Sequence, residues 1–335
     1  GRAMEIVYDD DQLDAAMAQL AGFGSLGREG GLSAERPVLV DRFLEDATEV
    51  DVDAIRDRTG DAIIGGVMEH VEEAGVHSGD SACAIPPYSL SPEVVARIEA
   101  TALQIAEALD VRGLINVQFA VRDGEVFVIE ANPRASRTVP FVAKATGVPL
   151  VKVASRVMVG ATLAELRAEG LLTEPNTDGH VAVKEAVLPF NRFPDADRVL
   201  GPEMRSTGEV MGIDRSFGLA FAKSQIAAGD RLPEGGRVFF SLAERDKPGG
   251  VRAARRYVDL GFELVATDGT ADALEAGGVP VARRVDKLGG DPVHGATAVD
   301  LIQAGEIQMV VNSPRGRGPR ADGGYIRAAA GVAGI

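Results

Sequence analysis

The sequence is poor in cysteine and in aromatic residues. It contains one cysteine, Cys83, and no tryptophan among its 335 residues. One cysteine excludes an internal disulfide and any metal site built from several cysteines, and it is typical of a reducing compartment. We therefore expect a cytoplasmic protein in which Cys83 is a small buried apolar side chain rather than a reactive thiol.

Long apolar runs and an excess of basic residues are also lacking. No apolar run approaches the ~18 residues of a membrane-spanning helix, and there is no basic-then-apolar leader. The 35 lysines and arginines are outnumbered by 50 aspartates and glutamates, which gives a net charge of −15. A nucleic-acid surface would need clustered Lys and Arg, so we expect neither a nucleic-acid nor a membrane partner.

The apolar pattern predicts three regions and a fold class of α/β and α+β. Residues 1–150 alternate strands, such as 38–40 and 62–64, with a helix that begins at the N-cap Ser91 and Pro92. Residues 151–228 open with a helix at 151–159, and 229–236 are expected to form a linker. Residues 238–335 follow a β-α-β pattern, with strands at 238–241, 262–267 and 308–312, which predicts a small doubly wound domain. The apolar face of the first helix is expected to contain Val95, Ile98, Ala102, Ile105 and Leu109.

The most informative stretch is Glu130-Ala-Asn132-Pro133-Arg134, which follows a strand at 125–130 that pairs with a strand at 114–121. A two-residue Asp123-Gly124 turn would place Gln118 and Glu130 on opposite faces of a regular hairpin. A three-residue loop with a left-handed Gly124 would instead place Asn116 and Gln118 on the face of Glu130 and Asn132. We expect the three-residue loop, because it gathers the polar residues.

These residue types suit a magnesium and polyphosphate site. Mg²⁺ prefers near-octahedral oxygen coordination, and Gln118, Glu130 and Asn132 offer two amide oxygens and a carboxylate. Arg134 adds a guanidinium for phosphate oxygens, so we assign Glu130, Asn132 and Arg134 a catalytic role in ATP chemistry. The alternative for the motif taken alone is a hairpin edge with solvated polar residues.

Several longer stretches carry a family resemblance that covers nearly the whole chain. The chain closely resembles the C-terminal half of the carbamoyl-phosphate synthetase large subunit family, namely its second ATP-grasp unit and the regulatory domain that follows. The stretches that carry the resemblance are Gly1-Arg2-Ala3-Met4-Glu5, Glu49-Val50-Asp51-Val52-Asp53, Gly75-Val76-His77-Ser78-Gly79-Asp80-Ser81, Arg137-Thr138-Val139-Pro140-Phe141-Val142 and Gly201-Pro202-Glu203-Met204-Arg205-Ser206-Thr207-Gly208-Glu209. Residues 1–150 are then expected to be the C-terminal portion of an ATP-grasp domain, and residues 151–228 to complete the synthetase unit.

The resemblance also implies roles for individual residues. ATP contacts are expected at Arg2, Arg42, Leu44, Glu49, Gly75, Val76, His77 and Ser78, and ATP-linked Mg²⁺ or Mn²⁺ at Gln118, Glu130 and Asn132. Arg42 stands where a bacterial relative has His. K⁺ is a further candidate cofactor. For His77 we favour a structural imidazole over a general base, since phosphoryl transfer to an anionic acceptor needs positioning and charge neutralisation more than proton removal.

Two effector sites follow from the same resemblance. Glu72, Asp80 and Glu185 match positions that bind ornithine, although each acid taken alone is more typical of an ordinary surface. Residues 238–335 resemble methylglyoxal synthase, truncated at the C-terminus, and are expected to bind nucleotide monophosphates through Ser241, Lys247, Thr267, Thr270, Lys287 and Asn312. Thr267-Asp268-Gly269-Thr270 lies just before a helix, where an anion or a simple N-cap would fit. Ser313-Pro314 departs from the two threonines of the bacterial pattern.

The resemblance implies ATP-dependent phosphorylation of carbamate to carbamoyl phosphate, in arginine and pyrimidine biosynthesis. It also implies a glutamine amidotransferase small subunit as partner, and an oligomer of such heterodimers. Gly1-Arg2-Ala3-Met4 resembles the interior of a glycine-rich ATP loop, so the segment alone is not expected to turn over ATP. Two alternatives stay open: another ATP-grasp ligase such as a biotin carboxylase, and a regulatory segment that binds nucleotides without turnover.

Overall fold

The computed structural model describes residues 4–22, 37–177, 179–190, 192, 193, 196, 198, 200–286, 293–313 and 322–335. The chain divides into two compact units. Unit 1 comprises residues 1–4, 20–189 and 200–230, and unit 2 comprises residues 5–19, 190–199 and 231–335. Helix α1 (Asp10–Gly22) precedes the first sheet along the chain. The prediction of a strand at 38–40 is wrong, because these residues form no strand and are largely exposed.

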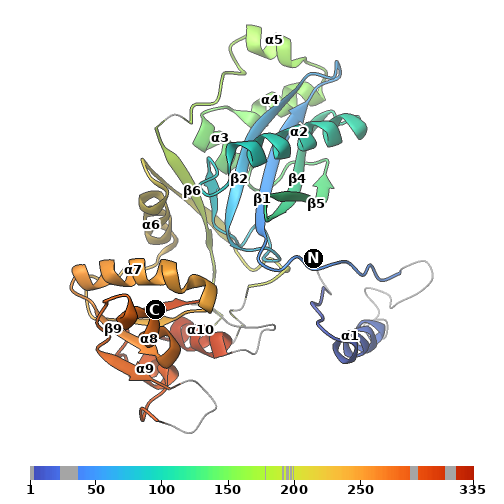
Figure 1. Cartoon of the computed structure of the whole chain (residues 1–335). Helices are drawn as coiled ribbons and strands as arrows, with labels where there is room; N and C mark the ends of the chain where they lie inside the picture. The colour runs from blue at the N-terminus through green and yellow to red at the C-terminus, as the bar shows by residue number, and fades with distance from the viewer. Residues whose placement is uncertain are drawn as a thin grey trace. The chain divides into compact units, whose positions relative to one another are not determined.

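Unit 1 is built around a seven-stranded antiparallel sheet (Figure 1). The strand order is β5-β4-β1-β2-β3-β6-β7. The strands are β1 (Thr48–Arg56), β2 (Ala62–Glu73), β3 (Cys83–Ile85), β4 (Gly113–Arg122), β5 (Glu125–Asn132), β6 (Val181–Val187) and β7 (Gly208–Asp214).

Residues of β1 alternate between two different environments, as strand geometry requires. Val50, Val52 and Ala54 are fully buried in an apolar cluster with helix α2 (Pro92–Ala108), whereas Asp51 and Asp53 lie on the other face of the strand. Helix α2 crosses its face of the sheet in Figure 1.

The capping of α2 confirms the prediction from sequence. The Ser91 hydroxyl accepts a hydrogen bond from the Val94 N–H, with Pro92 at the first helical position. The buried face differs slightly from the expected one, because Val94 and Ala106 are buried while Leu109 is 54% exposed. Ile98 and Ala102 belong to the buried face of the helix both in the prediction and in the structure.

The second face of the sheet is apolar in part. Ile55, Met68 and Leu114 pack there against helices from the middle of the chain, which closes the main core of unit 1. These helices are α3 (Val139–Thr146), α4 (Leu150–Met158) and α5 (Leu163–Ala168). Helix α6 (Phe217–Ala228) packs over β6 and β7. The part of this face formed by β5, β4 and β1 carries acids and amides at Glu130, Gln118 and Asp51, and it holds the first candidate site.

The β4–β5 hairpin corrects the predicted loop. Arg122 pairs with Glu125, so Asp123 and Gly124 form a two-residue turn, both with positive φ (52° and 78°). The expected three-residue loop is therefore wrong. A β-bulge supplies the missing residue instead: Phe119 pairs with Val128 and Gln118 pairs with Glu130, which leaves Ile129 without a partner on β4. The bulge therefore keeps Gln118 and Glu130 on the same face of the sheet, which the two-residue turn alone would not do.

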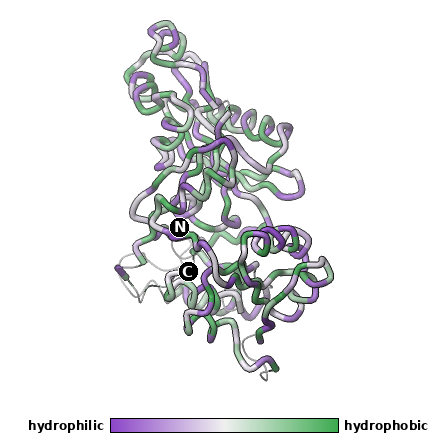
Figure 2. Tube along the Cα trace, turned by 90° about the vertical axis from the view of Figure 1, so that its left-hand side faces the viewer, coloured by the Kyte–Doolittle hydropathy of each residue, from purple (hydrophilic) through white to green (hydrophobic). Residues whose placement is uncertain are grey.

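Unit 2 contains a four-stranded parallel sheet in the order β10-β9-β8-β11. Parallel strands with intervening helices on both sides confirm the predicted α/β doubly wound domain. Its elements are β8 (Arg237–Ser241), the short 3₁₀ helix η2 (Glu244–Asp246), α7 (Lys247–Asp259), β9 (Glu263–Thr267), α8 (Asp268–Ala276), β10 (Arg283–Val285), α9 (Ala298–Gln303), β11 (Met309–Asn312) and α10 (Asp322–Ala333). Hydrophilic and hydrophobic segments alternate along the traces of both units in Figure 2, as expected for elements with one buried face. Within the described residues, no helix combines the length and apolarity that crossing a membrane requires.

Candidate nucleotide, metal and effector sites

The polar face of the unit 1 sheet brings Glu130, Gln118 and Asp51 into one row. Gln118 on β4 pairs with Glu130 on β5 and with Asp51 on β1. A second row lies beside it, since Asn116 pairs with Asn132 and with Asp53. Directly paired residues share a face, so the three predicted metal ligands stand on one side of the sheet.

Hydrogen bonds orient the two amides so that their oxygens are left for a cation. Gln118 Nε2 donates to Ser78 Oγ at 3.3 Å, and Asn132 Nδ2 donates to Glu130 Oε1 at 2.8 Å. An amide nitrogen cannot ligate a cation, whereas Gln118 Oε1, Asn132 Oδ1 and the exposed Glu130 carboxylate are hard oxygen donors. The donor set therefore fits a hard divalent cation of the Mg²⁺ type.

Glu49, one of the predicted nucleotide contacts, lies on the same face of β1 as Asp51 and is only 5% exposed. Its Oε2 accepts the Gly75 N–H at 3.3 Å. Burial raises the pKa of Glu49 above its ordinary value; repulsion from Asp51 and Glu130 adds to the shift, and His70 opposes it. The carboxylates of this face are thus close enough to influence one another.

Sequence reasoning missed a buried Asp51–His70 pair in this face. His70 Nε2 lies 3.2 Å from Asp51 Oδ2, and both side chains are 1% exposed. Burial opposes protonation of His70, but the neighbouring Cys83 and Asp51 outweigh it and raise the pKa of His70. The alternation Glu49-x-Asp51-x-Asp53 was the available signal, because three acids at period two in a strand rich in valine share one face.

Asp53 anchors the loop that carries the predicted phosphate-binding arginine. Its carboxylate accepts hydrogen bonds from Asn116 Nδ2 (3.0 Å), Ser136 Oγ (2.9 Å) and Thr138 Oγ1 (3.1 Å). Burial raises the pKa of Asp53 to about 6, against the effect of these hydrogen bonds. Arg134 is exposed in this loop, where its guanidinium is accessible to an anionic substrate.

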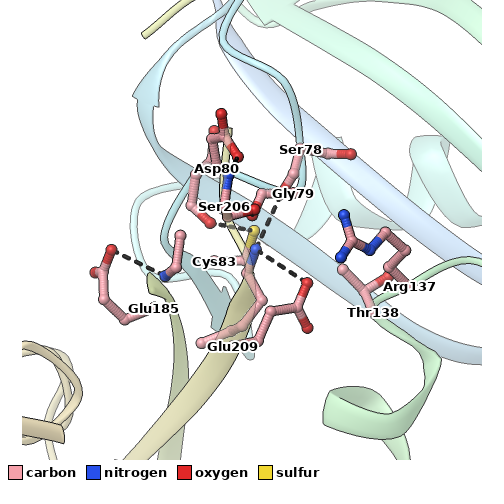
Figure 3. A network of polar contacts seen from close by, with 12 residues as sticks. Ser78, Gly79, Asp80, Cys83, Arg137, Thr138, Glu185, Ser206 and Glu209 are labelled. Atoms are coloured by element: carbon pink, nitrogen blue, oxygen red, sulfur yellow. Dashed lines mark hydrogen bonds and ion pairs between the residues drawn. The ribbon is translucent and has the colours of Figure 1, made fainter. Parts of the chain in front are cut away.

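The loop with Gly75, Val76, His77 and Ser78 is held to residues 201–206 (Figure 3). The His77 N–H donates to the Gly201 carbonyl at 2.8 Å, and Ser206 Oγ donates to the Gly79 carbonyl at 2.8 Å. His77 Nδ1 accepts the Gly79 N–H at 3.0 Å, and burial lowers the pKa of His77. These contacts give His77 a structural role in the loop, as the sequence favoured.

Other predicted nucleotide contacts lie near this loop or outside the described residues. Phe43, between Arg42 and Leu44, approaches Gly75: a Cβ at Gly75 would lie 3.8 Å from Phe43 Cε2. Arg42 is exposed and Leu44 is half-buried. Arg2 lies outside the described residues.

The three acids predicted to bind ornithine differ in their surroundings. Asp80 is 1% exposed and holds the backbone, because its two oxygens accept the Arg205 and Ser206 N–H groups at 2.7 and 2.8 Å. Glu185 is 8% exposed; burial, reinforced by Glu72, raises its pKa to about 7. Burial also raises the pKa of Glu72. The Glu72–Glu185 pair is thus a place where a cation would relieve repulsion, whereas Asp80 already has two backbone partners.

The predicted effector residues of unit 2 lie at the carboxyl edge of its parallel sheet. Ser241 and Asn312 end the neighbouring strands β8 and β11 and pair with each other. Thr267 ends β9, as predicted, whereas α8 begins at Asp268, inside the motif that was expected to precede the helix. In a doubly wound sheet the crevice lies where strand order reverses, which here is between β8 and β11.

Thr270 and Lys247 complete this cluster. Thr270 Oγ1 accepts the Leu242 N–H at 2.9 Å, and Lys247 Nζ lies 3.7 Å from the position of a Cβ on Gly269, at the α8 N-terminus. Ser313, which departs from the family pattern, bonds the neighbouring loop, since its Oγ accepts the Ala243 N–H at 2.9 Å. Lys287 and Pro314 lie outside the described residues.

Comparison with known proteins identifies both units. Residues 1–166 match the family model "Carbamoyl-phosphate synthase L chain, ATP binding domain", and residues 249–335 match the "MGS-like domain". The carbamoyl phosphate synthase large chain of Mycobacterium tuberculosis is 53% identical over 98% of this chain and 30% of its own length. That of Nostoc sp. is 50% identical over 98% of this chain and 28% of its own length.

A structural likeness to a biotin carboxylase is weaker. The Campylobacter jejuni enzyme complexed with β,γ-ATP is 15% identical, with a TM-score of 0.46 over 60% of this chain and 41% of that chain. This value is too low to carry an argument. The chain spans about 30% of the length of the curated relatives that it matches. It belongs to the carbamoyl phosphate synthase large chain family, in which it corresponds to a segment of the C-terminal half.

Proposed function

We propose that this segment catalyses, within its complete large chain, the ATP-dependent phosphorylation of carbamate to carbamoyl phosphate. The observation that carries the proposal is the direct pairing of Gln118 with Glu130, two positions along the strands from the pairing of Asn116 with Asn132, in a domain that matches an ATP-binding family model. ATP with Mg²⁺ or Mn²⁺ would be the cofactor, held through Glu130 and the two amide oxygens of Gln118 and Asn132.

The chain's own residues divide the work as follows. A bound divalent cation would neutralise charge that develops during phosphoryl transfer. Asp53 fixes the loop of Arg134, whose exposed guanidinium can bind oxygens of the phosphate or of the carbamate. Carbamate is already an anion, so its attack needs no base, and His77 Nδ1 is occupied by the Gly79 N–H. Binding and orientation therefore supply the catalysis.

The alternatives from the sequence gain no comparable support. A biotin carboxylase would share the Glu-x-Asn pattern, but the chain is 53% identical to a carbamoyl phosphate synthase large chain and matches the MGS-like domain. A purely regulatory segment would not need three oxygen donors on one sheet face and an accessible arginine in the loop that follows.

We further propose the partners and effectors of the complete protein. A large chain implies a small chain, and we assign this partner as a glutamine amidotransferase in an oligomer of heterodimers. Ornithine would bind at Glu72 and Glu185 with Asp80, and a nucleotide monophosphate at Ser241, Lys247, Thr267, Thr270, Lys287 and Asn312. K⁺ is proposed as an additional cofactor, and the pathways are arginine and pyrimidine biosynthesis in the cytoplasm.

The test is the partial back reaction of the complete large chain. Purified protein containing this sequence should form ATP from carbamoyl phosphate and MgADP, measured by a coupled luciferase assay. The matched control is Asn132→Asp with Glu130 intact, which keeps an oxygen donor and should retain part of the rate. Failure of the wild-type protein to form ATP with either Mg²⁺ or Mn²⁺ would overturn the proposal.

A further inference from the structure

Lys184 on β6 is a fully buried lysine in the core of unit 1. Its exposure is 0%, which places it among the largest fully buried side chains of the described chain. It pairs across the strands with Cys83 on β3 and Met211 on β7, so it points to the same face as these residues. A buried ammonium is costly unless it is well paired, so its retention in this core calls for a partner of matching chemistry.

The main partner of Lys184 is a backbone carbonyl in the nucleotide loop. Lys184 Nζ donates to the Ser78 carbonyl oxygen at 2.9 Å. The nearest carboxylate oxygen, Glu209 Oε1, is 3.9 Å away and is buried without a hydrogen-bond partner among the described residues. Ser78 and Glu209 lie in the polar network of Figure 3. The ammonium is thus hydrogen-bonded to the loop rather than to the acid.

Ser78 links this lysine to the candidate metal ligands. The Ser78 hydroxyl accepts from Gln118 Nε2, and Gln118 pairs with Glu130. A fixed Ser78 backbone holds its hydroxyl toward Gln118, and this bond turns Gln118 Oε1 away from Ser78. Ser78 therefore connects the buried Lys184 ammonium to the Gln118 amide, whose oxygen is a candidate metal ligand.

We propose that Lys184 is a positioning residue for nucleotide turnover. It fixes the Ser78 carbonyl, and through Ser78 it sets the orientation of the Gln118 amide. The inference rests on the proposed function for its kinetic readout, but the loop contact itself can be measured without metal or nucleotide. Lys184 touches neither substrate nor metal in this role.

The first measurement compares Lys184→Met with wild type in the complete large chain. Methionine keeps an unbranched apolar stem but removes the charge beside the buried Glu209, so the thermal midpoint should fall, because losing one partner leaves the other buried charge uncompensated. Amide hydrogen exchange in residues 75–81 should accelerate about 10- to 100-fold without metal or nucleotide, since a charge-assisted hydrogen bond is lost. The half-saturating Mg²⁺ concentration in the back reaction should rise by a similar factor.

Lys223→Met is the matched control. Lys223 Nζ also donates to a backbone carbonyl, that of Ile213 at 3.2 Å, and it faces Asp214 at 2.6 Å, but its side chain is 57% exposed on α6. This variant should change neither exchange in residues 75–81 nor the Mg²⁺ requirement. Lys184→Arg, which keeps a charged donor, should recover most of the wild-type Mg²⁺ dependence.

The possible outcomes separate the two proposals. Unchanged exchange in residues 75–81 of Lys184→Met would overturn the positioning role, as would an unchanged Mg²⁺ requirement whatever the thermal midpoint. If the wild-type protein forms no ATP, the proposed function fails, while the exchange measurement still decides the contact. If Lys184→Met does not fold, Lys184→Gln, which keeps an N–H donor, should show the same changes to a smaller extent.

Discussion

The two sheets of this chain place polar residues in different ways. In unit 1, the candidate metal ligands come from the body of antiparallel strands and meet by cross-strand pairing, as Gln118 and Glu130 do. In unit 2, the candidate effector residues come from strand ends and the helix that follows, as Thr267 and Thr270 do at the start of α8. A site inside an antiparallel face depends on register, whereas a site at a parallel edge depends on topology alone.

The difference also appears in the electrostatics. Several acids on the sheet of unit 1 are buried and repel one another, and burial raises the pKa of Glu49, Asp53 and Glu185. In unit 2, Asp268 at the α8 N-terminus is exposed and bonded to His294 and Arg284, and its pKa is lowered despite the opposing effect of desolvation. The first face therefore stores unfavourable charge that cationic ligands can relieve, while the acid at the second edge is already compensated.

The largest expected effect tests the register in unit 1. Glu130→Gln in the complete enzyme should lower ATP formation from carbamoyl phosphate and MgADP by about 10³-fold or more, because the carboxylate that would hold the divalent cation would contribute several kcal/mol. The exposed Glu130 carboxylate accepts one hydrogen bond, from Asn132, so the unfolding free energy should stay near wild type. ATP formation at the wild-type rate would contradict the role. Glu125→Gln, at the exposed start of the same strand, is the control and should keep full activity.

The sequence allowed most of the β4–β5 pairing to be predicted, but not the bulge that produces it. The limits of β4 and β5 to within about two residues, the Ser91 N-cap and the gathering of Gln118 and Glu130 on one face were predictable, since they follow from period-two patterns and capping chemistry. A three-residue loop was the expected cause of the shared face, whereas the structure produces it with a two-residue turn and a bulge at Ile129. A bulge depends on the edge position of β5, which local residue types do not encode.

The buried charges were harder to predict for the same reason. Lys184 and His70 resemble ordinary alternating polar residues of a strand until the pairings β2–β3 and β3–β6 place both on the face of Cys83. In unit 2, by contrast, a β-α-β order fixes which strand ends meet, so Ser241 and Thr267 could be assigned to one edge from the sequence alone. The metal and effector assignments themselves stay predictions.

The next largest effect tests the edge of unit 2. Lys247→Ala and Lys287→Ala should each weaken binding of UMP or IMP about 10- to 100-fold and remove the regulatory response, because each removes a charge-assisted bond to phosphate. Unregulated activity should be unchanged, since neither residue is among the candidate metal ligands. Isothermal calorimetry on the complete enzyme measures the binding, with and without ATP, because coupling between two sites is reciprocal.

Arg252→Ala provides the control for this prediction. Arg252 lies on α7 with Lys247, and its guanidinium donates to the Pro248 carbonyl at 3.2 Å. This variant should keep the effector response. Regulation that persists in both lysine variants would place the effector elsewhere, and absence of UMP and IMP binding to the wild-type enzyme would remove the assignment, with Ser313 the first residue to examine.

The smallest effect on activity is expected from Glu185→Gln, which tests the stored repulsion in unit 1. The folded-state pKa of Glu185 is raised from 4.5 to about 7, so its favourable contribution is complete below about pH 4.5 and is lost as the pH rises to about 7. The variant should therefore be more stable than wild type at pH 8, by on the order of 2–3 kcal/mol, and nearly equal to it at pH 5. Unregulated activity should change little, because Glu185 contacts Gln225 and the Ala186 N–H rather than the metal-binding row.

The measurement for Glu185→Gln is the thermal midpoint of the complete protein between pH 5 and pH 8, with and without ornithine. Ornithine is a cation and favours the charged carboxylate, so its affinity for wild type should increase as the pH rises through 7, and the variant should lose this dependence. Glu107→Gln, at an exposed position of α2, is the control and should leave both pH profiles unchanged. Equal pH dependence in Glu185→Gln and wild type would show that the repulsion between Glu72 and Glu185 does not contribute to stability. Ornithine binding that is independent of pH in the wild type would place the cation away from the Glu72–Glu185 pair. The charges of these buried acids would then be compensated without a ligand, as the charge of Asp268 in unit 2 is by His294 and Arg284.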